Sequence, residues 1–122
     1  MTLSTLQIIY AAWCLFRGIG FIFAPAQLWK TFSVNLDKST AFPVQLLGGA
    51  FIATAIVNWN VHSLVLDTTV HNILLFNFSM ELIQALLTIY GVFSQAVVRK
   101  ALGPFVIHLL FTIGFGYFLF IN

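Results

Sequence analysis

Charged side chains are scarce in this chain of 122 residues, since only 7% are Asp, Glu, Lys or Arg, whereas 61% are hydrophobic. A soluble globular domain carries about a quarter charged residues, so this chain has too few to cover a water-exposed surface. A disordered tail is excluded for the opposite reason, because it needs low hydrophobicity. A net charge of +2 is too small for a nucleic-acid-binding face. The composition predicts an integral membrane protein in contact with the lipid bilayer.

Cysteine is equally rare, and Cys14 is the single one in the sequence. One thiol excludes a disulfide within the chain and every site built from several cysteines. His62 and His71 flank a predicted loop in which Asp67 is the only carboxylate. These are too few ligands for a closed metal site, and we predict none. Residues 1–7 lack the positive charge of a secretory signal, so we expect the first apolar run to be a retained helix.

Four long apolar runs fill most of the chain, at about Leu3–Phe23, Phe42–Trp59, Val70–Phe93 and Leu102–Ile121. About 20 residues of α-helix span the roughly 30 Å hydrocarbon core of a bilayer. The runs lack the polar–apolar alternation of a membrane β-barrel. We therefore predict an all-α fold, an antiparallel four-helix transmembrane bundle that forms one membrane domain over residues 1–122.

A short segment after the first run has the pattern of a helix lying on the membrane surface. Pro25 opens it, and Leu28, Trp29 and Phe32 can share one side of a helix. An apolar side that carries Trp is typical of interfacial helices. We predict a short interfacial helix between the first two spans.

The ends of the other spans carry capping residues and prolines. Ser39 or Thr40 is expected to cap the second helix, with Pro43 in its first turn. Asp67 is expected to cap the third helix, and Pro104 falls in the first turn of the fourth. Gly49 and Ala53 have the small-xxx-small spacing that lets helix backbones approach closely.

The distribution of basic residues predicts an orientation. Lys30 and Lys38 lie in the first connection, Arg99 and Lys100 lie in the third, and the second holds Asp67 but no Lys or Arg. Loops rich in Lys and Arg stay on the cytoplasmic side. We expect both termini outside and the basic loops in the cytoplasm, or on the matrix or stromal side in an organelle.

Polar residues inside the spans fall on single helical faces. In the third span the steps between them are four, three and four, which matches one face of an α-helix. The stripes are Asn77, Glu81, Gln84 and Thr88 in the third span, Tyr10, Cys14 and Arg17 in the first, His108, Thr112 and Gly116 in the fourth, and Gln45 and Gly49 in the second. We expect these stripes to face the interior of the bundle.

Two of these residues carry opposite charges, and we predict an ion pair between Arg17 and Glu81. Gln84, His108 and Gln45 are expected within hydrogen-bonding reach of it. A lone charge at the centre of a membrane helix costs on the order of 2.5–3.5 kcal/mol on insertion scales, which favours a paired or protonated Glu81. The cluster has two interpretations: an interaction that fixes helix register, or a site for a ligand such as a proton, an ion or an anionic head group.

His108 is the only histidine deep within a span. It could therefore be an axial ligand for haem or a chlorophyll-type pigment, and the 14 Phe residues would suit a flat apolar cofactor or a quinone. The alternative is a hydrogen-bonded histidine of the helix interior with no cofactor.

Several segments together resemble a known group of small membrane proteins. They are Phe16-Arg17-Gly18-Ile19-Gly20 with the following Pro25, Gln45-Leu46-Leu47-Gly48-Gly49-Ala50, Asn58-Trp59, and His108 with Gly114-Phe115-Gly116. The pattern is similar to that of the DoxX-like family of four-helix membrane proteins. Some members of that group are subunits or associates of membrane oxidoreductases, so the resemblance implies an accessory role and transfers no catalytic residue.

The leading functional hypothesis is a non-catalytic accessory or scaffold subunit of a larger, energy-transducing membrane complex. The sequence has no nucleophile–base pattern and no nucleotide-binding loop, so we predict that it is not an enzyme. The expected partners are other membrane subunits or further copies of the chain. The alternatives are a small oligomeric proton-coupled carrier or channel, and a bundle that binds lipid, quinone or pigment.

Overall fold

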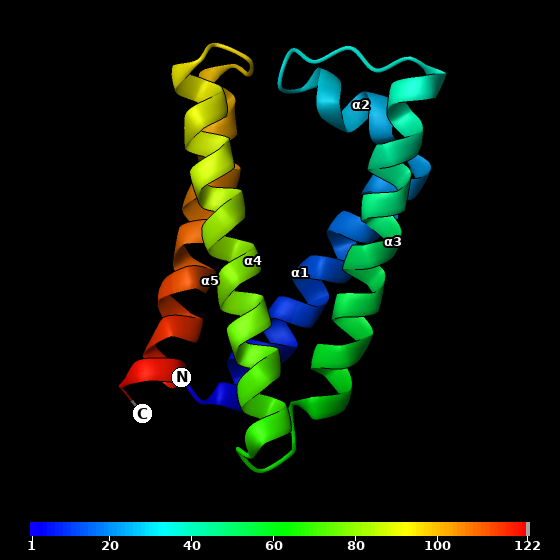
Figure 1. Cartoon of the computed structure of the whole chain (residues 1–122). Helices are drawn as coiled ribbons and strands as arrows, with labels where there is room; N and C mark the ends of the chain where they lie inside the picture. The colour runs from blue at the N-terminus through cyan, green and yellow to red at the C-terminus, as the bar shows by residue number, and fades with distance from the viewer. Residues whose placement is uncertain (122) are drawn as a thin grey trace. The chain divides into compact units, whose positions relative to one another are not determined.

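The computed structural model describes residues 1–121, and this part of the chain consists of helices joined by loops, with no strand (Figure 1). Four of its helices are long and apolar enough to cross a membrane. They are α1 (Leu3–Phe23), α3 (Lys38–Val61), α4 (Thr68–Phe93) and α5 (Leu102–Phe120), the last extended by the 3-10 turn η1 (Arg99–Ala101). A short helix, α2 (Pro25–Lys30), lies between α1 and α3. The predicted all-α class, with four long apolar helices and a short helix between the first two, is confirmed.

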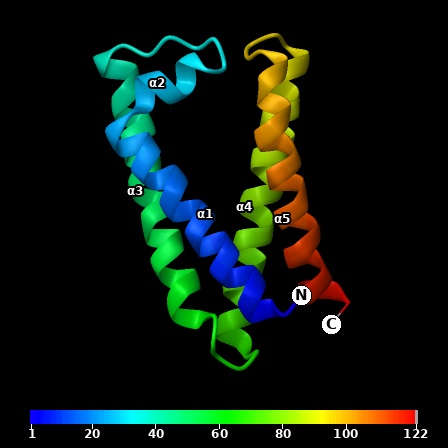
Figure 2. The same ribbon diagram turned by 180° about the vertical axis from the view of Figure 1, so that it is seen from behind.

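Contacts between residues divide the chain into two compact units, Met1–His62 and Ser63–Asn122. In the first unit, α1 and α3 run in opposite directions and pack against each other, and α2 contacts both (Figures 1 and 2). The core of this unit includes Tyr10 and Cys14 of α1 and Phe51 of α3, none of which is exposed. The first unit is therefore a helical hairpin whose connection carries α2.

The backbones of α1 and α3 approach each other closely at Gly18 and Gly48. A Cβ atom added to Gly48 would lie 2.9 Å from the Gly18 carbonyl oxygen, and one added to Gly18 would lie 2.7 Å from the Gly48 oxygen. Gly49, by contrast, has no atom within 4 Å of such a Cβ position, and Ala53 is exposed. The small-residue contact therefore uses Gly48, and the pair Gly49 and Ala53 points away from α1.

In the second unit, α4 and α5 pack in opposite directions along their length, and η1 contacts both (Figures 1 and 2). The buried residues of α4 repeat every three or four positions, as on one side of an α-helix, and include Val70, Leu74 and Ala85. Those of α5 do the same with Phe111, Phe115 and Phe118. The second unit is a helical hairpin with an apolar seam.

The start of α3 differs from the sequence prediction. α3 begins at Lys38, four residues before the predicted start, and its N-cap is Asp37, not Ser39 or Thr40. The Asp37 carboxylate accepts the Thr40 backbone N–H, while the Thr40 hydroxyl accepts the Asp37 N–H, which forms a capping box. Because the helix starts earlier, Pro43 lies beyond its first turn.

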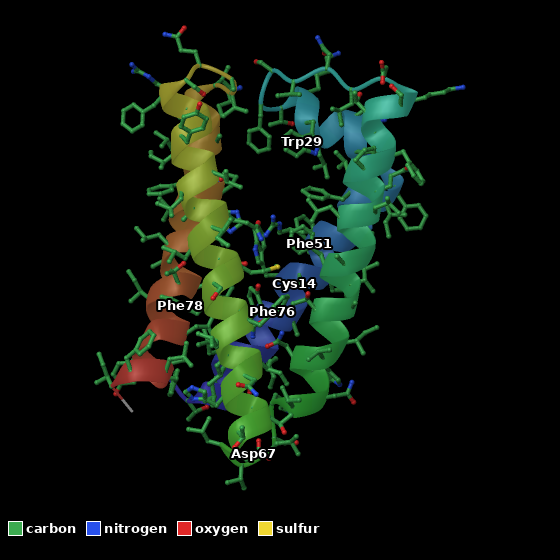
Figure 3. All side chains as sticks on the ribbon, in the orientation of Figure 1. Cys14, Trp29, Phe51, Asp67, Phe76 and Phe78 are labelled. Carbon is green, nitrogen blue, oxygen red and sulfur yellow. The ribbon has the colours of Figure 1, made fainter. Side chains whose placement is uncertain are left out.

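The predicted cap of α4 and the predicted position of Pro104 agree with the structure. Asp67 caps α4, and its carboxylate accepts the backbone N–H of Val70 at 2.8 Å. It lies in the turn that leads into α4 (Figure 3). Pro104 falls in the first turn of α5, where its missing N–H has no intrahelical partner to lose.

Asp37 makes the start of α3 sensitive to acid. The backbone N–H of Thr40, followed by the hydroxyls of Ser39 and Thr40, lowers the pKa of Asp37 from 3.8 to about 2. A folded-state pKa below the unfolded one gives stability that is present above the unfolded pKa and lost as the pH falls through the folded pKa. We expect this contribution to disappear between 3.8 and about 2.

The variant Asp37→Asn tests this expectation, because asparagine also caps helices but carries no titratable carboxyl. The melting temperature in detergent, followed by circular dichroism, should fall less steeply in Asp37→Asn than in the wild type over this acidic range. Equal slopes for the two proteins would contradict the assignment.

Candidate functional site

The second unit contains a buried pair of titratable side chains. Glu81 lies in the middle of α4, and His108 lies near the start of α5. The Oε2 atom of Glu81 is 2.6 Å from Nδ1 of His108, which is a short hydrogen bond. The exposed fraction is 0% for the Glu81 side chain and 5% for that of His108. The pair therefore links α4 to α5 through two buried side chains.

Packing on both helices sets the position of this pair. Glu81 belongs to the buried row of α4 with Leu74 and Asn77, and His108 is the first residue of the buried row of α5. The Thr112 hydroxyl donates to the His108 carbonyl oxygen at 2.8 Å, so it meets its hydrogen-bonding need on its own helix. The apolar rows of the hairpin thus fix the separation at which Glu81 and His108 meet.

The charge of the pair depends on how many protons it holds. With two protons, the pair is either a carboxylate beside an imidazolium or a carboxylic acid beside a neutral imidazole, and its net charge is zero in both forms. Unpaired charge is costly in an apolar environment. With one proton fewer, the pair would carry a net charge of −1.

Arg17 of the first unit lies among aromatic rings. Its guanidinium carbon is 4.0 Å from the centre of the Phe51 ring, 5.6 Å from that of Trp13 and 5.7 Å from that of Phe21. A cation over an aromatic face is stabilised by about 0.5–2 kcal/mol, depending on its hydration. Trp13, Arg17 and Phe21 are spaced by four on α1, and Phe51 comes from α3 (Figure 3). This aromatic surrounding holds the guanidinium against the first hairpin.

The other predicted site residues lie as follows. Gln45 donates from Nε2 to the Ile22 carbonyl oxygen at 3.0 Å, which links α3 to the end of α1. Gln84 is partly buried on α4, and its carbonyl oxygen accepts the Thr88 hydroxyl at 2.7 Å. The structure thus brings Glu81 and His108 together and uses Gln45 within the first hairpin. The ion pair of Arg17 with Glu81 joins residues of different units and stays a prediction.

Several buried or contacting residues were not among the predicted site residues. The spacing of Trp13, Arg17 and Phe21 by four residues could have indicated that two aromatic rings flank Arg17. The contact with Phe51 joins two helices, so no local pattern in the sequence indicates it. Gln7 and Asn58 are buried in the first unit with exposed fractions of 1% and 0%. The Asn58 amide donates to the Thr54 carbonyl oxygen at 3.0 Å, a bond to the preceding helical turn.

Within residues 1–121, no three His, Cys, Asp or Glu side chains are grouped as they are around a metal ion. Comparison of the chain with protein-family models, with curated proteins and with solved structures gives no match.

Proposed function

We propose that this chain is a multi-pass membrane protein that serves as a non-catalytic accessory or scaffold subunit of a larger membrane complex. The observation that carries the proposal is the amount of apolar surface left on its spans. In the most apolar stretch of each span, only 17% to 33% of the residues are buried. The remaining apolar side chains are available to lipid and to the helices of other subunits.

The exposed surface also includes a place where another helix can approach closely. Gly49 and Ala53 are both exposed, one helical turn apart on α3. Small residues at this spacing are typical of contacts between membrane helices. Because this side of α3 faces away from α1, we assign it to a helix of a partner subunit.

The orientation proposed for this subunit follows the basic residues. Lys30 ends α2, Lys38 begins α3, and Arg99 and Lys100 lie in η1. We place these two connections on the cytoplasmic side, or on the matrix or stromal side in an organelle, and both termini on the other. In this orientation α2, with Trp29, lies at the cytoplasmic membrane surface.

The variant Gly49→Leu tests the partner surface. A leucine at Gly49 meets no atom of its own chain within 4 Å of its Cβ, so it leaves the hairpin intact but keeps a partner helix away. We expect at least a tenfold lower yield of the partner per copy of the chain, since about 1.4 kcal/mol of lost contact energy is a tenfold change in affinity. The measurement is extraction from the native membrane in mild detergent, followed by native mass spectrometry.

Gly103→Leu is the matched control, because Gly103 is also exposed and has equally open surroundings. It should retain the partner at the wild-type ratio. A wild-type chain that is recovered with lipid alone, with no partner at a fixed ratio, would contradict the accessory role.

A second candidate function, a small proton-coupled carrier, is favoured by the buried pair of Glu81 and His108. A titratable pair inside a membrane hairpin is the kind of group that proton-coupled transport requires. Solute uptake into vesicles that depends on a proton gradient and is lost in Glu81→Gln would favour the carrier over the accessory subunit. A haem or pigment absorption band lost in His108→Gln would instead favour a cofactor-binding bundle.

A further inference from the structure

We propose that Leu64, Val65 and Leu66 form an apolar anchor that inserts into the lipid headgroup layer where α3 ends and α4 begins. The three residues lie in the loop between these helices, since α3 ends at Val61 and α4 begins at Thr68. We base the anchor on the assignment of the two helices as membrane spans, and it is independent of the accessory role.

The side chains of the apolar anchor are exposed, which is unusual for a loop. The exposed fractions are 54% for Leu64, 85% for Val65 and 47% for Leu66. In residues 31–37, by contrast, the apolar side chains are half-buried and the exposed ones are polar or charged. The connection between α4 and η1 exposes one large apolar side chain, that of Val98, at 36%. Contact with lipid would remove the apolar anchor from water, which is favourable.

The position of this loop identifies its partner as lipid. A loop of six residues between two spans lies at the membrane surface, within reach of the headgroups. Trp59, in the last turn of α3, is 60% exposed, and tryptophan is enriched at this layer of a bilayer.

The charge of the loop favours zwitterionic lipid over anionic lipid. Between α3 and α4, Asp67 is the only Asp, Glu, Lys or Arg side chain. Its carboxylate accepts the backbone N–H of Val70 as the cap of α4. Anionic headgroups are attracted by clusters of Lys and Arg, which this loop lacks. Phosphatidylcholine is therefore a sufficient partner for the apolar anchor.

The irregular backbone of the loop limits how deep the anchor can lie. Residues 62–67 belong to no helix. Irregular backbone in contact with lipid does not occur within the hydrocarbon core, because its polar groups would lose their hydrogen bonds. The backbone therefore stays among the headgroups, and the side chains enter the boundary between headgroups and acyl chains, as apolar faces do to on the order of 5–10 Å.

The experiment is electron paramagnetic resonance on the full chain in phosphatidylcholine vesicles, with a nitroxide attached to Val65→Cys. Oxygen concentrates among acyl chains, whereas a nickel chelate stays in water, so their effects on relaxation report the depth of the label. We expect several-fold more oxygen and several-fold less nickel contact than for Ala96→Cys, an exposed position before η1. The native Cys14 is buried, and unlabelled wild-type chain is the control for its reactivity.

A second variant tests whether the apolar side chains cause the insertion. In Val65→Cys combined with Leu64→Ser and Leu66→Ser, we expect nickel contact to rise several-fold as the loop moves into water. Unchanged depth in this variant would overturn the anchor, because the ends of the spans alone would then position the loop.

Two other results with Val65→Cys alone would also overturn the anchor. A label in water would leave the loop free for a protein partner, and a label shielded from both reagents would indicate contact between proteins. Release of the chain by alkaline carbonate would contradict the membrane spans themselves. Insertion in vesicles that hold this chain alone would support the anchor even if the accessory role fails.

Discussion

Replacing His108 with leucine is expected to destabilise the second hairpin by roughly 3 kcal/mol. The substitution removes the imidazole from a carboxyl group that has no exposed surface. Removing one member of a buried charged pair costs about 3–5 kcal/mol, and a charge at the centre of a membrane helix costs about 2.5–3.5 kcal/mol on insertion scales. The measurement is the free energy of unfolding of the chain in mixed micelles, titrated with a denaturing detergent.

The double variant Glu81→Leu with His108→Leu separates the lost hydrogen bond from the cost of the carboxyl group that His108→Leu leaves in place. Replacing both partners by apolar residues of similar volume is often neutral, so we expect the double variant to recover most of the stability. His71→Leu, at an exposed position, serves as the control and should change little. If the double variant is as unstable as His108→Leu, the cost does not come from the carboxyl group.

Adding a methyl group at Gly48 is expected to destabilise the first hairpin by about 1–3 kcal/mol, the usual range for overpacking. The new Cβ would lie 2.9 Å from the Gly18 carbonyl oxygen and 2.9 Å from the Phe21 Cβ. Both of these atoms are fixed by the α1 backbone, so no side-chain rotation can relieve the clash. Unfolding of Gly48→Ala in mixed micelles checks the prediction.

Gly49→Ala is the matched control, one residue further along the same helix. Its Cβ meets nothing within 4 Å, and alanine favours a helix over glycine by about 0.5–1 kcal/mol. We therefore expect Gly49→Ala to be neutral or slightly stabilising. Equal losses in the two variants would show that the α1–α3 contact does not depend on Gly48.

The spans were predictable because they are set by local composition. The predicted first span coincides with α1, and the fourth ends one residue from the end of α5. The second was predicted too short, because the apolar run of the sequence begins only at Phe42. α3 begins at Lys38 because the capping box of Asp37 and Thr40 stabilises a polar first turn. Helix ends in polar segments depend on such hydrogen bonds more than on hydropathy.

The candidate site was predictable only in part. The spacing of Asn77, Glu81 and Gln84 placed the carboxyl on one face of its helix, and His108 was recognised as a deep polar residue. The pattern within one helix cannot state which residue of another helix lies opposite, because that depends on the packing of both. The contacts of Arg17 with Phe51 and of Gln45 with Ile22 also join two helices, so the pattern within one helix could not predict them.

The sequence by itself determined the helical class, the four long apolar helices, the short helix after Pro25 and the polar faces of the long helices. These follow from the cost of exposing backbone polar groups to lipid and from the period of the α-helix. Only the tertiary structure decided that His108 meets Glu81 and that Gly48, not Gly49, touches α1. Such pairings depend on the rotation of each helix about its own axis, and this rotation is fixed by the side chains of both helices packing together.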